Sequence, residues 1–160
     1  MEWIISPGFD APEDIAALFR EYTDALVAGN PAFRAYLNLQ GYDDEVRHLE
    51  RKYGPPDGRL WLLRVDGNPA GCVGLKRFDD RCCEIKRLYV RPAYREHGLG
   101  GQLVRQVIAD AREIGYSAVL LDTLPFLTVA IGMYERLGFR QIPSYNGSPM
   151  ENLVYMRLDL

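Results

Sequence analysis

The chain has 160 residues, 48% of them hydrophobic, which is the size of one ordinary domain and enough to bury a core. Its net charge is −3 without a block of basic residues, which disfavours nonspecific binding to nucleic acid or to an anionic membrane. No apolar run approaches the roughly 18 residues of a membrane span, and the first residues lack the pattern of a secretory signal, so we expect a cytoplasmic protein without a membrane partner.

Three cysteines, Cys72, Cys82 and Cys83, are expected to be reduced core thiols, because their number is odd and two are adjacent. The two histidines, His48 and His97, lie far from any CxxC pair, so no metal site is expected.

Strand and helix patterns follow one another without a linker or a repeat, which predicts one domain over residues 1–160. Residues 3–6 are a short strand, and Asp10 and Glu13 have the spacing of a capping box before a helix that ends at Gly29. A less regular helical region covers 33–52 and is broken near Gly41. Three strands of an antiparallel meander follow at 60–65, 70–78 and 82–90.

Two more helices and three more strands are expected in the second half. Apolar residues keep helical spacing from Gly98 to residue 114, and Gly115 is a natural stop. A buried strand at 117–123, a helix at 129–137 and strands at 138–142 and 152–160 complete the chain. The order of elements predicts a mixed α/β fold.

A glycine-rich loop joins the strand that ends before Pro92 to the following helix. Arg95, Gly98 and Gly100 form the pattern R-x-x-G-x-G, and the unpaired N–H groups of a first helical turn bind anions. We favour a diphosphate at this loop. The alternative is that the glycines only permit close packing of helix and strand.

Two motifs resemble those of one enzyme family. "KRLYVRPAYREHGLGGQLV" is similar to the acetyl-CoA-binding motif of GNAT-type N-acetyltransferases, and "AIGMYERLGF" is similar to their second motif. "C-E-x-K-R-L-Y-V-R-P" and "L-D-T-L-P" further resemble a group of small, poorly characterised members. The element order is similar to this family's fold, a central mixed, mostly antiparallel sheet of about seven strands flanked by about four helices.

The resemblance implies an enzyme that transfers an acetyl group from acetyl-CoA to a primary amine of a small molecule or amino-acid-like acceptor and releases CoA. In the family, one strand splays away from its neighbour, and its backbone binds the pantetheine arm; the matching residues are Leu88, Tyr89 and Val90. Backbone amides of the loop then wrap the pyrophosphate, here at Arg95, Glu96, His97, Gly98, Leu99, Gly100 and Gly101.

One position departs from the family's pattern. Many relatives carry an asparagine seven residues before the motif tyrosine, where this chain has Leu127. We expect the pantetheine contacts to differ there, with Thr123 or Thr128 as substitutes.

Acyl transfer needs a neutral amine, a donor for the oxyanion and a proton for the departing thiolate. By resemblance, Glu84, eleven residues before Arg95, is the general base through water; the alternative is an ion pair with Lys86 on the same strand face. Tyr134 matches the tyrosine that protonates the CoA sulfur and lies one turn after Ala130; the alternative is a core aromatic with a satisfied hydroxyl. No cysteine has an obvious adjacent base, so direct transfer without an acyl-cysteine is expected.

The resemblance places the acceptor between the early helices, the central strand ends and the last hairpin. Asp122 ends a buried strand and needs a partner, either an ammonium group of the acceptor or the loop that follows. The other acceptor candidates are Tyr22, Tyr36, Tyr42, Tyr145 and Asn146. Dimers are common in the family, so a homodimer is a further expectation.

Other functions stay open at this point. They are a protein or peptide N-acetyltransferase, a noncatalytic sensor of acyl-CoA, and a dinucleotide-binding oxidoreductase. The last would need a third glycine where Leu103 stands and an acidic residue near position 120, a condition that only Asp122 meets.

Overall fold

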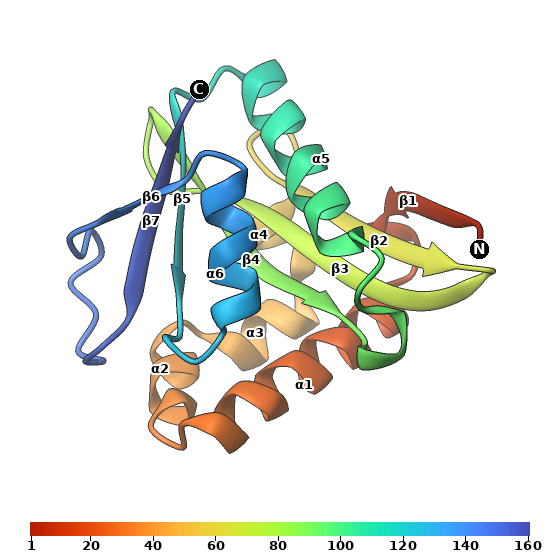
Figure 1. Cartoon of the computed structure of the whole chain (residues 1–160), viewed down its shortest axis with the longest axis horizontal. Helices are drawn as coiled ribbons and strands as arrows, with labels where there is room; N and C mark the ends of the chain where they lie inside the picture. Colours follow the sequence, from red (N-terminus) through yellow and green to blue (C-terminus); the bar gives the residue numbers. More distant parts are fainter.

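The computed structural model describes all 160 residues, and its centre is a seven-stranded sheet in the order β1-β2-β3-β4-β5-β7-β6 (Figure 1). Only β4 and β5 are parallel neighbours. The strands are β1 (Trp3–Pro7), β2 (Arg59–Val65), β3 (Asn68–Arg77), β4 (Cys82–Val90), β5 (Ala118–Thr123), β6 (Arg140–Ile142) and β7 (Val154–Asp159). The helices are α1 (Pro12–Gly29), α2 (Phe33–Leu39), α3 (Tyr42–Arg47), α4 (Leu49–Tyr53), α5 (Leu99–Ile114) and α6 (Thr128–Arg136). Two short 3-10 helices are Gly8–Asp10 and Pro92–Tyr94. No helix has both the length and the apolar character needed to span a membrane.

The mixed, mostly antiparallel sheet is confirmed, and each predicted strand is present within two residues of its expected bounds. The number of helices was wrong, because the region at 33–52 forms three helices and the chain has six instead of about four. Gly41 takes a left-handed φ of 70° between α2 and α3, and His48 leaves helical geometry between α3 and α4. These two breaks divide the region into short helices, and the last of them, α4, packs with α1 on one face of the sheet.

The capping box expected at Asp10 and Glu13 was also wrong. Asp10 ends the 3-10 helix Gly8–Asp10, and α1 begins at Pro12 without a side-chain cap. Proline has no N–H group to satisfy, so it suits the first helical position, and the cap is not needed there.

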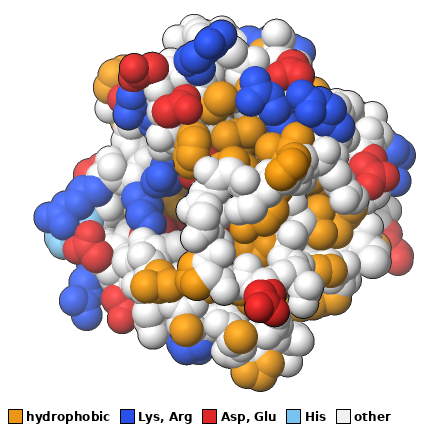
Figure 2. Space-filling view, turned by 90° about the vertical axis from the view of Figure 1, so that its left-hand side faces the viewer, with side chains coloured by type: hydrophobic (Ala, Val, Ile, Leu, Met, Phe, Trp, Pro, Cys, Tyr) orange, Lys and Arg blue, Asp and Glu red, His pale blue; other side chains and the backbone are white.

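Each face of the sheet is covered by its own helices (Figure 1). In β2, Leu63 and Val65 pack in the core with α5 and α6, whereas Leu60 and Leu62 pack against α1 and α4. This alternation is the period of two that a strand imposes on a sheet buried on both faces. On the face that Figure 2 presents, hydrophobic side chains gather beside a hollow that carries Lys or Arg side chains.

Candidate functional site

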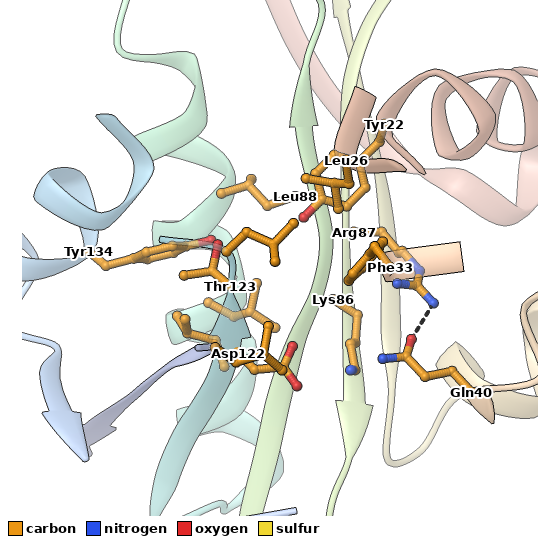
Figure 3. Close-up of a pocket in the computed structure, with 14 residues that line it drawn as sticks. Tyr22, Leu26, Phe33, Gln40, Lys86, Arg87, Leu88, Asp122, Thr123 and Tyr134 are labelled. Carbon is orange, nitrogen blue, oxygen red and sulfur yellow. Dashed lines mark hydrogen bonds between the residues drawn. The ribbon is translucent and has the colours of Figure 1, made fainter. Parts of the chain in front are cut away.

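Strands β4 and β5 part halfway along their length. Their parallel ladder runs from the pair Cys82 and Ala118 to the pair Glu84 and Leu120 and ends there. Beyond this point β4 pairs only with β3, and β5 pairs only with β7. The edge of β4 that faces β5 therefore has no strand partner over residues 85–90, and a cavity lies between the two strands (Figure 3).

A β-bulge re-aims the second half of β4. Lys86 pairs with Gly74 and Tyr89 pairs with Cys72, so three steps of β4 oppose two steps of β3. Arg87, inside the bulge, has a left-handed φ of 57°. Before the bulge the odd-numbered residues of β4 pack with α5, and after it the even-numbered ones do. The extra residue thus changes which side chains and backbone groups reach the cavity.

The Arg87 guanidinium is held by a buried carboxylate, that of Glu45. Its Nε and Nη2 donate to Glu45 at 2.8 and 2.9 Å, and its Nη2 also donates to Gln40 Oε1 at 2.8 Å. Lys52 Nζ and the Tyr53 hydroxyl each donate to Glu45 at 2.8 Å. Burial alone would raise the pKa of Glu45, but Arg87 and Lys52 lower it to about 2. This network fixes the bulge against α3 and α4.

The loop before α5 presents a row of free donors. Gly98 has a left-handed φ of 72°, and none of the amides of residues 96–101 donates a hydrogen bond within the chain. A Cβ at Gly98 would meet nothing within 4 Å, and one at Gly100 would meet only Met133 Cε at 3.9 Å and Val90 Cγ2 at 4.0 Å. Close packing therefore does not require glycine at these two positions. Free amides and open space together fit an anionic group.

The other residues matched to the cofactor motif lie around this loop. Arg95 turns back, so that its Nε donates to the Val90 carbonyl at 2.9 Å and its guanidinium lies 5.8 Å from the centre of the Tyr89 ring. Leu88 lines the cavity, while Tyr89 packs on the α1 side of the sheet. Glu96 and His97 are exposed, whereas Leu99 is buried in the core.

Tyr134 points from α6 into the cavity (Figure 3). The residue is 5% exposed, and its hydroxyl has no hydrogen-bond partner within the chain. The structure therefore does not show the alternative, a core tyrosine whose hydroxyl is hydrogen-bonded to the chain. Burial raises the pKa of Tyr134, so the hydroxyl keeps its proton and can donate it.

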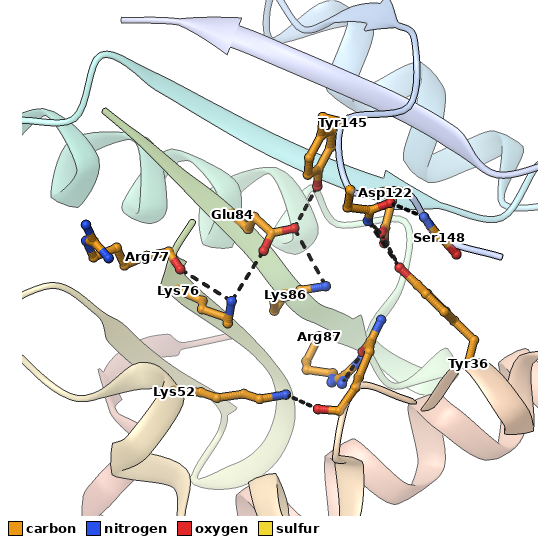
Figure 4. A network of polar contacts seen from close by, with 12 residues as sticks. Tyr36, Lys52, Lys76, Arg77, Glu84, Lys86, Arg87, Asp122, Tyr145 and Ser148 are labelled. Atoms are coloured by element: carbon orange, nitrogen blue, oxygen red, sulfur yellow. Dashed lines mark hydrogen bonds and ion pairs between the residues drawn. The ribbon is translucent and has the colours of Figure 1, made fainter. Parts of the chain in front are cut away.

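Glu84 is 4% exposed and does not line the cavity. The Tyr145 hydroxyl donates to its Oε2 at 2.7 Å, and the ammonium groups of Lys76 and Lys86 lie 3.6 and 3.8 Å from its oxygens (Figure 4). The ion pair with Lys86, expected as the alternative to a base, is thus present. A path from Glu84 to an acceptor amine would need a bridging water.

Three acceptor candidates form one cluster. Asp122 Oδ2 accepts hydrogen bonds from the Tyr36 hydroxyl at 2.6 Å and from Asn146 Nδ2 at 2.9 Å. The chain itself thus supplies the partners expected for Asp122. Tyr22 lines the cavity, while Tyr42 lies apart from this cluster, with its hydroxyl 3.2 Å from Thr23 Oγ1.

The position that departs from the family pattern does not close the cavity. Leu127 does not line the cavity but packs against an apolar cluster beside it, and Thr123 lines the cavity while Thr128 does not. That cluster contains Leu26, Phe33, Tyr36, Leu37 and Leu124.

The sequence analysis did not identify two cationic side chains, Arg87 and Lys86, as lining the cavity. Arg87 was not considered, and Lys86 was considered only as a partner of Glu84. An arginine within a buried strand signals a buried carboxylate, because an unpaired charge is costly there. Nothing local identifies Glu45, 42 residues away, as that carboxylate.

The three cysteines are free and buried, as expected for reduced core thiols. Burial raises the pKa of Cys83 to about 12 and also raises the pKa values of Cys72 and Cys82. Thiols in this state are poor nucleophiles.

Comparisons with known proteins agree with this geometry. The model of the "Acetyltransferase (GNAT) family" matches residues 16–139. The chain is 39% identical over 150 residues to an uncharacterized N-acetyltransferase of Schizosaccharomyces pombe, covering 92% of this chain and 88% of that protein. It is 34% identical over 111 residues to the N-acetylaspartate synthetase of Homo sapiens, covering 68% of this chain but 36% of that protein.

Solved structures share the fold. An acetyltransferase from Streptococcus agalactiae matches with a TM-score of 0.77 at 21% identity, over 99% of this chain and 98% of that one. A GNAT family acetyltransferase from Elizabethkingia anophelis, solved with acetyl-CoA bound, matches with a TM-score of 0.56 at 25% identity, over 65% of this chain and 77% of that one.

Proposed function

The chain belongs to the acetyltransferase (GNAT) family, and from that premise we propose that it transfers an acetyl group from acetyl-CoA directly to the primary amine of a small molecule. The observation that carries this proposal is the separation of β4 from β5, which leaves a cavity between the edge of β4 that has no strand partner and the unpartnered hydroxyl of Tyr134. A relative named N-acetylaspartate synthetase supports a small acceptor.

Acetyl-CoA has two sets of partners in this proposal. The free amides of residues 96–101 bind the pyrophosphate, aided by the dipole of α5. Leu88, Tyr89 and Val90 offer the pantetheine arm the free edge of β4, and Thr123 adds a hydroxyl on the facing strand. Arg95 must leave the Val90 carbonyl if its charge is to reach a phosphate.

Bound acetyl-CoA supplies the thioester that the amine attacks. Tyr134 donates the proton that the departing thiolate takes up, since its hydroxyl faces the cavity and remains protonated. Glu84 receives the proton of the amine through water. The buried cysteines take no part, so the acetyl group passes directly between the two substrates.

Isothermal titration with CoA, acetyl-CoA and NADH tests the cofactor. Saturable binding of both CoA species without NADH binding is expected, and the absence of CoA binding would refute the proposal. Release of CoA thiol with a panel of amines then separates an enzyme from a sensor, because a sensor binds acetyl-CoA without turnover. Acetylation of peptides but of no small amine would favour a protein acetyltransferase.

A further inference from the structure

Lys86 and Asp122 lie opposite each other where β4 and β5 have separated. Glu84 pairs with Leu120 in the parallel ladder, and two further residues along each strand bring Lys86 level with Asp122 on the same face. No ion pair within 4.0 Å joins them; the ammonium of Lys86 pairs with Glu84 instead. The splay thus holds two opposite charges apart at the wall of one cavity (Figure 3).

The Lys86 ammonium forms an ion pair with Glu84 but donates no hydrogen bond within the chain. Its side chain is 13% exposed, and its nearest carboxylate oxygen, Glu84 Oε2, is 3.8 Å away, beyond hydrogen-bond distance. Glu84 is also shared with Lys76 and accepts from Tyr145. A mostly buried ammonium that has no hydrogen-bond acceptor within the chain and opens onto the cavity suits an anionic ligand, and a carboxylate has the required acceptors.

Asp122 has the opposite need. Its Oδ2 is occupied by Tyr36 and Asn146, but its Oδ1 accepts no hydrogen bond within the chain. The side chain therefore retains acceptor capacity beside the cavity, which suits an ammonium group. Gln40, whose Oε1 is bound by Arg87, turns its amide nitrogen toward the Lys86 side and adds a second donor for an anion (Figure 3).

We propose that the acceptor is an α-amino acid, bound as a zwitterion with its carboxylate on Lys86 and its ammonium on Asp122 Oδ1. This inference rests on the proposed function and names the substrate class. The ammonium loses one proton through water to Glu84, and the neutral nitrogen forms a bond to the acetyl carbon as the bond from carbon to sulfur breaks. The thiolate takes the Tyr134 proton, and the second proton lost by the nitrogen restores the hydroxyl, giving an N-acetylamino acid and CoA.

The first test compares acids with their neutral analogues. The twenty L-α-amino acids, their carboxamides and the corresponding decarboxylated amines are offered to the wild-type chain with acetyl-CoA, and thiol release is followed. We expect kcat/KM for the preferred amino acid to exceed that for its carboxamide by about tenfold or more, the effect of one hydrogen bond to a charged group. Equal or faster reaction of carboxamides or simple amines overturns the inference and leaves the proposed function standing. Absence of acetyl-CoA binding in the separate titration overturns both.

The second test removes the ammonium. Lys86→Met is expected to lower kcat/KM for the amino acid by about 10- to 100-fold, mainly through KM, with little change for the carboxamide. Lys76→Met is the matched control, because Lys76 also pairs with Glu84 but does not line the cavity. Lys76→Met is expected to keep the wild-type ratio of kcat/KM for the amino acid to kcat/KM for its carboxamide. An unchanged ratio in a folded Lys86→Met variant overturns the inference, and if that variant fails to fold, the wild-type comparison decides.

Discussion

Gly100→Ala separates a ligand-binding role of the glycine loop from a packing role. Gly100 lies in the first turn of α5, and its new methyl group would meet only side-chain carbons at 3.9 and 4.0 Å, which are ordinary contacts. The free protein should accept this change. A CoA pyrophosphate bound to the neighbouring amides should not, because the methyl group keeps it away.

Gly100→Ala should raise the stability of the free protein and lower its affinity for CoA. Replacing a helical glycine by alanine stabilises a protein by about 0.4–1 kcal/mol, and for a chain of this size about 1 kcal/mol corresponds to about 2–4 °C in Tm. Loss of one hydrogen bond to a charged phosphate costs about 1.5–3 kcal/mol, or roughly a 10- to 100-fold weaker Kd. The variant should therefore be slightly more stable alone and bind CoA much more weakly.

Thermal unfolding with and without CoA measures both effects at once. At a CoA concentration of about 100 times the wild-type Kd, binding stabilises the wild type by about 2.7 kcal/mol. A variant whose Kd for CoA is tenfold higher is stabilised by only about 1.4 kcal/mol at the same CoA concentration, so its CoA-induced shift in Tm falls to about half.

Gly132→Ala is the matched control, since it also places alanine in a helix and its Cβ would meet only the Arg136 Nη1 at 3.4 Å. It should keep the full CoA-induced shift. A Gly100→Ala variant that binds CoA like the wild type would refute the assignment of this loop to the pyrophosphate. A lower Tm without ligand would instead revive the packing explanation.

Three further substitutions test the chemistry and the fold. Tyr134→Phe should lower kcat by about 10²-fold or more with unchanged CoA affinity in steady-state rates and titration; a loss of stability without a loss of kcat would contradict the acid role. Glu84→Gln should lower turnover most at low pH, where more of the amine needs deprotonation, whereas an equal loss across a pH series would indicate a positional role. Glu45→Gln should lower the urea-unfolding free energy at pH 7 by about 3–5 kcal/mol, because buried Arg87 loses its charged partner. The pKa of Glu45 is about 2 in the folded chain and about 4.3 unfolded, so its stabilising effect is present above pH 4.3 and is lost as pH falls toward 2, where the variant should approach the wild type. A constant difference between the two proteins down to that pH would exclude this linkage.

The parts of the fold that could be predicted have local signals. The strands follow from apolar runs and turns, and the free donors before α5 follow from the glycines that start a helix directly after a strand. The break at Gly41 was visible for the same reason, although the second break, at His48, was not, since histidine carries no comparable turn signal.

The unpredicted parts depend on contacts between distant segments. The ion pair of Arg87 with Glu45 joins β4 to α3. The bulge that orients Arg87 is a shift in register between β3 and β4, so it cannot be read from the sequence of either strand alone. The position of Lys86 level with Asp122 follows from the register of β4 against β5, which only the assembled sheet defines.

The bulge and the splay together explain why one strand can serve both proposed substrates. Tyr134 of α6 bounds the cavity on one face of the sheet, while Tyr22 of α1, Phe33 of α2 and Gln40, which follows α2, bound it on the other. A thioester held along the free edge of β4 and an amine held between Lys86 and Asp122 can therefore approach each other from opposite faces. Both reactants are then bound at once, and no residue needs to carry the acetyl group. This agrees with cysteines that are buried and hold their protons.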